Sequence, residues 1–234
     1  MTYRNKHTGA FVLALSAALL SSQALAIPVT VSGATVSFTY DSDLAGLFGA
    51  PTVVADSIFF NPTSFKAQSF NGAGFVSTSQ TFNITVNAKP GYLVSAVNLT
   101  EDGDYYNIGS GTGVAVGGKL YVRDLGSPLS TPLSASIKPT APLTDVTTLG
   151  DFETTNWTAT AGVTVPSAVS GVNVTIQNIL LANSSSLGSA AFIEKKFAGL
   201  SIVTAIPEPQ TYALFLAGLG LVGFMAWRGS RLPA

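Results

Sequence analysis

Apolar and polar residues alternate with a period of two through much of the chain, a pattern typical of half-buried β-strands. The alternation is clearest at Val29 and Val31, at Val36, Phe38 and Tyr40, at Phe82, Ile84 and Val86, and at Val172, Val174 and Ile176. Such strands bury one face and expose the other, as antiparallel sheets commonly do. The pattern therefore predicts sheets rather than helices for the body of the protein.

Turn-forming dipeptides separate these segments from further candidate strands. The other expected strands are Gly113–Arg123, Phe152–Thr160 and Ala190–Phe197, and the expected turns are Asn71-Gly72, Pro90-Gly91, Asp102-Gly103 and Gly117-Gly118. Many short strands with such turns are typical of an antiparallel β-sandwich. We therefore expect an all-β fold, jelly-roll or immunoglobulin-like, with a connectivity that the sequence leaves open.

Two segments of the body depart from the alternation. Asp41-Ser42-Asp43 offers N-cap oxygens, and Leu44, Leu47 and Phe48 share one helical face before Gly49 and Pro51, which predicts one short helix that closes the sandwich. Ser127–Pro142 contains four prolines and few large apolar residues, so we expect it to be a long loop.

The first 26 residues have the organisation of a secretory signal peptide. Arg4 and Lys6 precede the apolar run Ala10–Leu20, and Ala24 and Ala26 form an Ala-x-Ala cleavage site. The apolar run is shorter than the roughly 20 residues that a membrane-spanning helix needs, which argues against an uncleaved anchor. We expect signal peptidase to cleave after Ala26, so that residues 27–206 form the exported body.

A second apolar segment lies near the other end of the chain. Tyr212–Trp227 carries no charge, has an aromatic residue at each edge, and is followed by Arg228 and Arg231. Positive charge is retained on the cytoplasmic side of a membrane, and aromatic rings favour its interfaces. Residues 212–227 are therefore predicted to form a transmembrane helix that leaves the preceding body outside.

At these residues the chain resembles the PEP-CTERM sorting signal. Residues 207–231 contain Pro207-Glu208-Pro209, an apolar helix with Ala217-Gly218-Leu219-Gly220-Leu221, and a short basic end, in that order. The resemblance implies export in a Gram-negative bacterium that makes exopolysaccharide, and cleavage near the tripeptide by the membrane enzyme exosortase. The alternative is an ordinary anchor in which the prolines only stop the helix from extending upstream.

Two segments of the body also look like a body type common among PEP-CTERM proteins. They are Thr52–Lys66 and Phe82–Tyr105, with Ser57-Ile58-Phe59-Phe60 and Lys89-Pro90-Gly91-Tyr92 among the residues that carry the likeness. That group has no established activity, so the likeness supports the fold class and no catalytic role.

The composition excludes several kinds of chemistry. The chain has no cysteine, and its one histidine, His7, lies in the predicted signal peptide. The mature protein would therefore lack Ser-His-Asp and Cys-His catalysis and any zinc site that needs imidazole or thiolate. Residues 27–206 hold seven Lys and Arg against eleven Asp and Glu, a balance that does not favour nucleic acid binding. We expect no cofactor.

Glu101, Asp102 and Asp104 form the one acidic cluster of the sequence. Their oxygens around Gly103 are of the kind that calcium prefers. The EF-hand spacing is absent, however, so the favoured interpretation is a solvated turn that joins two strands, and no metal site is predicted. No motif selects a pair of carboxylates for glycoside hydrolysis, so no catalytic residue is predicted either.

Five aromatic residues could offer a stacking platform for sugars, although aromatic side chains in a sandwich more often pack in the core. They are Tyr92, Tyr105, Tyr106, Tyr121 and Trp157.

The favoured hypothesis is a non-enzymatic exported protein of the cell surface or extracellular matrix, held transiently at the inner membrane and associated with exopolysaccharide or biofilm. The alternatives are an exported carbohydrate-binding adhesin and, less favoured, a secreted hydrolase that works through carboxylates alone. The expected partners are signal peptidase, exosortase, the inner membrane and exopolysaccharide.

Overall fold

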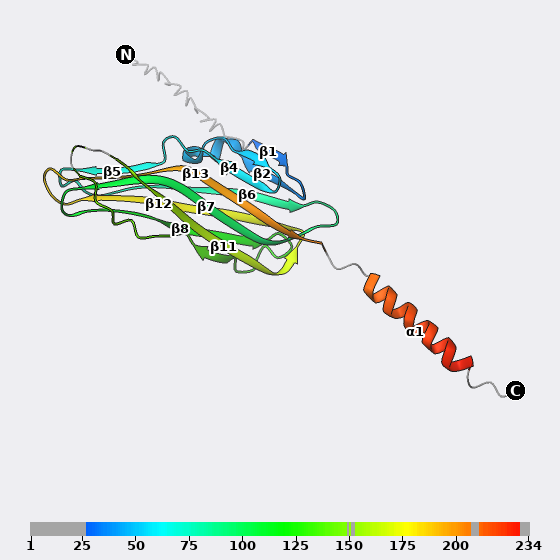
Figure 1. Ribbon diagram of the computed structural model, residues 1–234. Coiled ribbons are helices and arrows are strands. Elements are labelled where there is room, and N and C mark those ends of the chain that lie inside the picture. Colours follow the sequence, from blue (N-terminus) through cyan, green and yellow to red (C-terminus); the bar gives the residue numbers. More distant parts are fainter. Residues whose placement is uncertain (1–26, 149, 151–152, 207–210, 230–234) are drawn as a thin grey trace, which may run out of the picture.

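The structure is a computed structural model that describes residues 27–148, 150, 153–206 and 211–229. Along these residues, thirteen strands form two antiparallel sheets that pack face to face (Figure 1). Sheet A has the order β1 (Pro28–Ser32), β2 (Val36–Asp41), β6 (Gly74–Ala88), β12 (Gly171–Ser184), β8 (Thr112–Asp124) and β9 (Leu133–Ser136). The all-β sandwich that the alternation predicts is confirmed.

Sheet B forms the other layer. Its order is β10 (Lys138–Pro139), β11 (Thr155–Val169), β7 (Leu93–Ile108), β13 (Ala190–Ala205), β4 (Ser57–Phe60) and β3 (Thr52–Val54), and β5 (Lys66–Phe70) also pairs with β13. The long strands switch sheet at each step along the chain: β6, β8 and β12 lie in sheet A, whereas β7, β11 and β13 lie in sheet B. The polypeptide therefore crosses the sandwich repeatedly, and this crossing is the connectivity that the sequence leaves open.

Four phenylalanine rings fill the core beneath the β2–β3 connection. Phe48, Phe60, Phe65 and Phe82 are all almost fully buried. The Phe48 ring lies 5.5 Å from both the Phe60 and the Phe65 ring, and Phe60 lies 5.2 Å from Phe82, with edge-to-face geometry in each pair. Edge-to-face contacts suit the quadrupoles of the rings, so this cluster stabilises the sandwich beyond simple area burial.

The predicted helix after β2 forms as two short 3-10 turns. These are η1 (Ser42–Leu44) and η2 (Gly46–Phe48), and the Asp41 carboxylate caps the first by accepting a 3.0 Å hydrogen bond from the Asp43 N–H. Gly46, the first residue of η2, has a positive φ of 51°, which breaks the helical geometry. The expected cap is confirmed, whereas one continuous helix is wrong.

Three other local expectations need correction. Asp102-Gly103 lies inside β7 and Gly117-Gly118 inside β8, so neither dipeptide forms a turn. Ser127–Pro142 is not a continuous loop, because β9 pairs with β8 and β10 pairs with β11 within it. These two strands lie at the edges of their sheets, where proline is tolerated because one side of the strand needs no hydrogen-bond partner.

A β-bulge divides β13. Lys195 pairs with Gly103 of β7, but the next pair along is Phe197 with Asp102, so Lys196 is the extra residue. The inward positions therefore change from Ala191, Ile193 and Lys195 before the bulge to the even-numbered positions from 198 to 202 after it. A bulge re-aims side chains in this way and is common beside functional sites.

The last described element is α1 (Thr211–Gly229), at the end of the chain that Figure 1 colours red. In Figure 1 it lies apart from the sandwich and packs on neither sheet. Its apolar side chains are exposed, including Phe215, Leu219 and Phe224. The helical part of the prediction for residues 212–227 is thus confirmed. Among the described residues, however, no helix combines the length and apolar character needed to cross a membrane.

Candidate functional site

The acidic cluster lies in the middle of β7 and not in a turn. Along Glu101–Asp104, β7 is paired with β11 on one side and with β13 on the other. Successive side chains of a strand point to opposite faces, so Glu101 points into the sandwich while Asp102 and Asp104 lie on the outer face of sheet B. The expectation of a solvated turn is therefore wrong, because two neighbouring strands hold this backbone extended.

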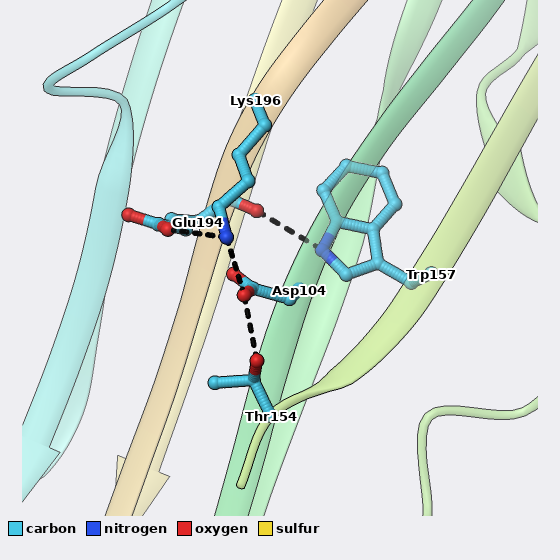
Figure 2. A network of polar contacts seen from close by, with 5 residues as sticks. All are labelled: Asp104, Thr154, Trp157, Glu194 and Lys196. Carbon is cyan, nitrogen blue, oxygen red and sulfur yellow. Dashed lines mark hydrogen bonds and ion pairs between the residues drawn. The ribbon is translucent and has the colours of Figure 1, made fainter.

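Gly103 is what lets this sequence remain in a strand. Trp157 is its partner on β11, and the indole Nε1 donates a 3.1 Å hydrogen bond to the backbone carbonyl of Glu194 on β13 (Figure 2). The ring therefore crosses over Gly103. A Cβ at position 103 would lie 1.9 Å from the Glu194 oxygen and 2.8 Å from the indole. Glycine is present for close approach, and not for a turn.

The outer face carries a network centred on Lys196. Figure 2 shows its ammonium between two carboxylates: Nζ lies 2.5 Å from Oδ2 of Asp104 and 3.2 Å from Oε1 of Glu194. The Thr154 hydroxyl donates a 2.7 Å hydrogen bond to the same Asp104 oxygen. The hydrogen bonds to Asp104 and Glu194 raise the pKa of Lys196. Because the Lys196 side chain is 56% exposed, this is a surface network of modest energy.

The remaining acidic residue of the cluster is also engaged with a neighbouring strand. Asp102 Oδ1 accepts a 2.7 Å hydrogen bond from the Thr158 hydroxyl of β11. Across the described ranges, no group of three or more His, Cys, Asp or Glu residues is placed to hold a metal ion. That the acidic cluster binds no calcium stays a prediction.

On the inner face, three polar side chains meet within the core. Nζ of Lys195 lies 2.7 Å from Oε1 of Glu101, and both side chains are completely buried. Asn178, itself 3% exposed, donates from its Nδ2 to the same carboxylate oxygen. Glu101 lies on β7 and Lys195 on β13 of sheet B, whereas Asn178 lies on β12 of sheet A. One carboxylate oxygen thus joins the two layers.

The surroundings of this cluster are aromatic. Nζ of Lys195 lies 4.9 Å from the centroid of the Phe65 ring and 5.6 Å from that of Phe48. Burial lowers the pKa of Lys195 to about 8, although the attraction of Glu101 opposes the shift. Burial likewise raises the pKa of Glu101, against the contributions of Lys195 and Asn178. Both shifts favour the neutral amine and the neutral acid, since a low-dielectric environment penalises charge.

Sequence reasoning missed Lys195 and Asn178, although a signal for both was present. Asn178 continues the inward series Val172, Val174 and Ile176, and Lys195 has the parity of Ala191 and Ile193. Glu101 likewise follows Val97 and Leu99 at inward parity. Polar residues at the buried positions of three strands would have identified all members of the cluster.

The five aromatic candidates do not form one platform. Tyr105 and Trp157 are buried in the core. Tyr106 stacks on Phe192, with ring centroids 5.2 Å apart, on the outer face of sheet B. Tyr121 lies on β8 of sheet A, where it lines a small surface hollow with Arg123 and Asn173. Tyr92 is half-buried in the connection between β6 and β7, so the aromatic residues that remain accessible are divided between that connection and the two outer faces.

The predicted processing residues lie mostly beyond the described residues. Pro207, Glu208 and Pro209 of the sorting motif, Ala24 and Ala26 of the signal cleavage site, and Arg231 are all outside those ranges. Arg228 is in the last turn of α1 and is exposed. β13, the last strand of the sandwich, ends at Ala205, so only a few residues separate it from α1.

The fold and the C-terminal helix together define a class: an antiparallel β-sandwich followed, a few residues later, by a separate helix with exposed apolar side chains and with Arg228 in its last turn. The family model of the PEP-CTERM protein-sorting motif matches residues 205–231. The chain therefore carries a PEP-CTERM sorting motif, as the resemblance implies, and this motif implies processing by exosortase. The match covers the C-terminal segment and leaves the sandwich unassigned.

Comparisons of the whole chain add little. No curated protein matches its sequence. Among solved structures, the structure of the infectious bursal disease virus Gx strain is similar at 13% identity, with a TM-score of 0.24. That likeness covers 80% of this chain and 48% of the viral chain. We draw no conclusion about fold or function from a similarity of this size.

Proposed function

We propose that the protein is a non-enzymatic exported protein of the cell surface or extracellular matrix, delivered by an exosortase-type system. The observation that carries the proposal is the PEP-CTERM motif over residues 205–231, placed where the final strand of the sandwich ends. α1 supports it, because its exposed apolar side chains, which lie away from both sheets in Figure 1, need another environment to cover their surface. In this proposal that environment is the inner membrane, until cleavage releases the body.

The polar clusters of the sandwich support a structural role rather than hydrolysis. A carboxylate-dependent glycosidase needs two accessible carboxyl groups held across a sugar. Here Glu101 is buried in the core in an ion pair with Lys195, and the Asp104 carboxylate is bonded to Lys196 and Thr154. The separation of the accessible aromatic residues likewise favours the matrix role over the sugar-binding adhesin. Association with exopolysaccharide belongs to the proposal and follows from the setting that the motif implies.

The test follows the body by immunoblot in strains with and without exosortase. An epitope tag inserted after Leu129 is suitable, because that side chain is 99% exposed and lies between β8 and β9. We expect the tagged body to leave the membrane fraction only when exosortase is present. Glu208→Gln should keep the body membrane-bound in both strains, because the recognition element is altered while the apolar helix is intact.

Two further variants serve as controls. Glu153→Gln changes an exposed glutamate away from the motif and should be released like the wild type. Replacing Arg228 and Arg231 with glutamine should weaken retention of the tail on the cytoplasmic side, because the positive flank is removed. Equal release of the wild-type body from both strains would contradict the proposal and would leave α1 as an ordinary anchor.

A further inference from the structure

The buried cluster of Lys195, Glu101 and Asn178 lies outside residues 205–231, which the sorting motif covers. Charged groups in a core are costly, and apolar residues of similar volume are often as stable or more stable. These three polar side chains nevertheless stand at inward positions of three different strands. Their arrangement contains the three groups that amide transfer requires: an amine, a primary amide and a carboxyl group between them.

The amine and the amide are close because they share one partner. Nζ of Lys195 is 2.7 Å from Oε1 of Glu101, and Nδ2 of Asn178 donates to that same oxygen. Two nitrogens that both contact one oxygen are at most about 5 Å apart, given ordinary hydrogen-bond lengths. Because the packed core holds both groups beside one oxygen, attack of the amine on the amide is an intramolecular reaction, which removes the entropic cost of bringing free reactants together.

Two oxygen atoms of the cluster also lack hydrogen-bond partners. Within the part of the chain that the structure describes, Oδ1 of Asn178 and Oε2 of Glu101 are buried and make no hydrogen bond. A half turn of the Asn178 amide exchanges Nδ2 for Oδ1 next to Glu101, where a protonated carboxyl group would donate to it. The amide is thus placed to be polarised by the neutral acid.

We propose that Lys195 and Asn178 form an intramolecular isopeptide bond, with Glu101 as the residue that moves the protons. The bond joins Nζ of Lys195 to Cγ of Asn178 and ties β13 of sheet B to β12 of sheet A. It is a covalent modification of the folded protein by its own residues.

The reaction balances without an oxidant, a reductant or a cofactor. The Lys195 ammonium first gives a proton to the Glu101 carboxylate, which leaves a neutral amine and a carboxylic acid. The amine attacks Cγ of Asn178, and Glu101 donates its proton to the developing oxyanion and then recovers it. The bond from Cγ to Nδ2 breaks, and that nitrogen takes one proton from Nζ and leaves as ammonia. One amide replaces another.

The environment favours the first step. Burial lowers the pKa of Lys195 to about 8 and raises the pKa of Glu101, so transfer of the proton from amine to acid costs less than it would in water. The rings of Phe48 and Phe65 keep water from the amine, which leaves it a better nucleophile and limits hydrolysis of the amide.

The position of the bond suits an exported protein that is held by its C-terminus. β13 leads directly into the sorting segment, so tension between the anchor and the body acts first on this strand. A bond from β13 to the central strand β12 would pass that load to the other sheet without relying on hydrogen bonds alone.

The test is a peptide map of the folded full-length chain. After circular dichroism has established β-structure, the protein is denatured and digested with a protease that cleaves after glutamate. Cleavage after Glu153 and Glu194 places Asn178 and Lys195 on different peptides. We expect these peptides to remain joined, with a combined mass lower by one ammonia, about 17 Da, as attack by a lysine amine on an amide requires.

Matched variants separate the three roles. Lys195→Met, Asn178→Ala and Glu101→Gln should each abolish the joined peptide. Lys196→Gln, at the neighbouring exposed lysine, and Asn173→Ala, at an outward position of β12, should retain it. If a cluster variant does not fold, the wild type still decides the question. Folded wild-type protein that yields two separate peptides, with Asn178 intact or converted to aspartate, overturns the proposal.

Discussion

In β7, Gly103 determines whether the acidic residues on either side of it form a turn or remain in a strand. Glu101, Asp102 and Asp104 look like a solvated turn because they flank a glycine, but each carboxylate meets a partner from an adjacent strand. Gly103 makes this possible, because the missing Cβ leaves room for the indole of Trp157. The local preference for a turn is weaker than the pairing and packing that the strand gains.

The first prediction concerns this glycine. Gly103→Ala should lower the free energy of unfolding by about 1–3 kcal/mol, the usual cost of overpacking, because the new Cβ would collide with the Glu194 carbonyl and the indole. Urea denaturation monitored by the fluorescence of Trp157 and Trp227 measures the change.

Gly113→Ala is the matched control for this substitution. Gly113 lies in β8, and a Cβ there would meet nothing within 4 Å. This variant should be as stable as the wild type or slightly more so, because alanine loses less backbone entropy on folding. Equal stability of the Gly103→Ala variant would show that Trp157 does not depend on close approach to this backbone.

At the scale of elements, a single carboxylate links the ends of two strands in different sheets. Asp56, in the turn between β3 and β4 of sheet B, accepts 2.6 Å hydrogen bonds from the N–H and the hydroxyl of Thr35 and a 3.2 Å bond from the N–H of Val36. Val36 begins β2 of sheet A. The backbone carbonyl of Asp56 also accepts a hydrogen bond from the N–H of Ile202 on β13.

The second prediction follows from the titration of Asp56. Burial alone would raise its pKa, but the hydrogen bonds from Thr35 and Val36 outweigh burial and lower the pKa below 3.8. Because the folded carboxylate binds its proton less tightly than the unfolded one, its contribution is complete above pH 3.8 and is lost as the pH falls through the folded pKa. Asp56→Asn should cost about 1.5–3 kcal/mol at pH 7, as expected for hydrogen bonds to a charged group.

The measurement is urea unfolding of the wild type and of Asp56→Asn between pH 2 and pH 7. The difference between the two proteins should shrink as the pH falls below about 4, since protonation then removes the same charge in the wild type. Asp43→Asn, at an exposed carboxylate, should follow the wild type throughout. A difference that stays constant down to pH 2 would contradict the assigned role of the ionised carboxylate.

At the scale of the whole molecule, the sandwich and α1 are spatially separate in Figure 1, and we expect them to be energetically independent. The sandwich has its own core, built from both sheets, and α1 presents exposed apolar side chains (Figure 1). In the proposed function a membrane enzyme recognises the tail and removes it, so the tail should not be needed to keep the body folded. The residues of the hydrophobic core lie within the sandwich and its 3-10 turns, which supports a body that folds without α1.

The third prediction tests that separation. Ending the chain after Ile206 should leave the thermal midpoint of the sandwich unchanged within about 2 °C, because no packing on either sheet is lost. Ending it after Ala198 instead removes the part of β13 that pairs with β4 and with the first half of β7, and this chain should not fold. Near-ultraviolet circular dichroism during heating compares both with the full chain. A drop of several degrees in the first truncation would show that the tail stabilises the body.

The sequence by itself determined the fold class, most of the strands and the sorting motif, because all three depend on residues that are close together in the chain. Alternation of apolar and polar residues identifies the buried face of a strand, and the motif is contiguous. It predicted β13 only as far as Phe197, because the bulge at Lys196 reverses the parity of the apolar residues that follow. Only the tertiary structure decided which strands became neighbours, that Asp102-Gly103 remained extended, and that Glu101, Lys195 and Asn178 share one oxygen. Those three residues are far apart or on different sheets, and what joins them is the packing of the two layers, a long-range effect that no local pattern specifies.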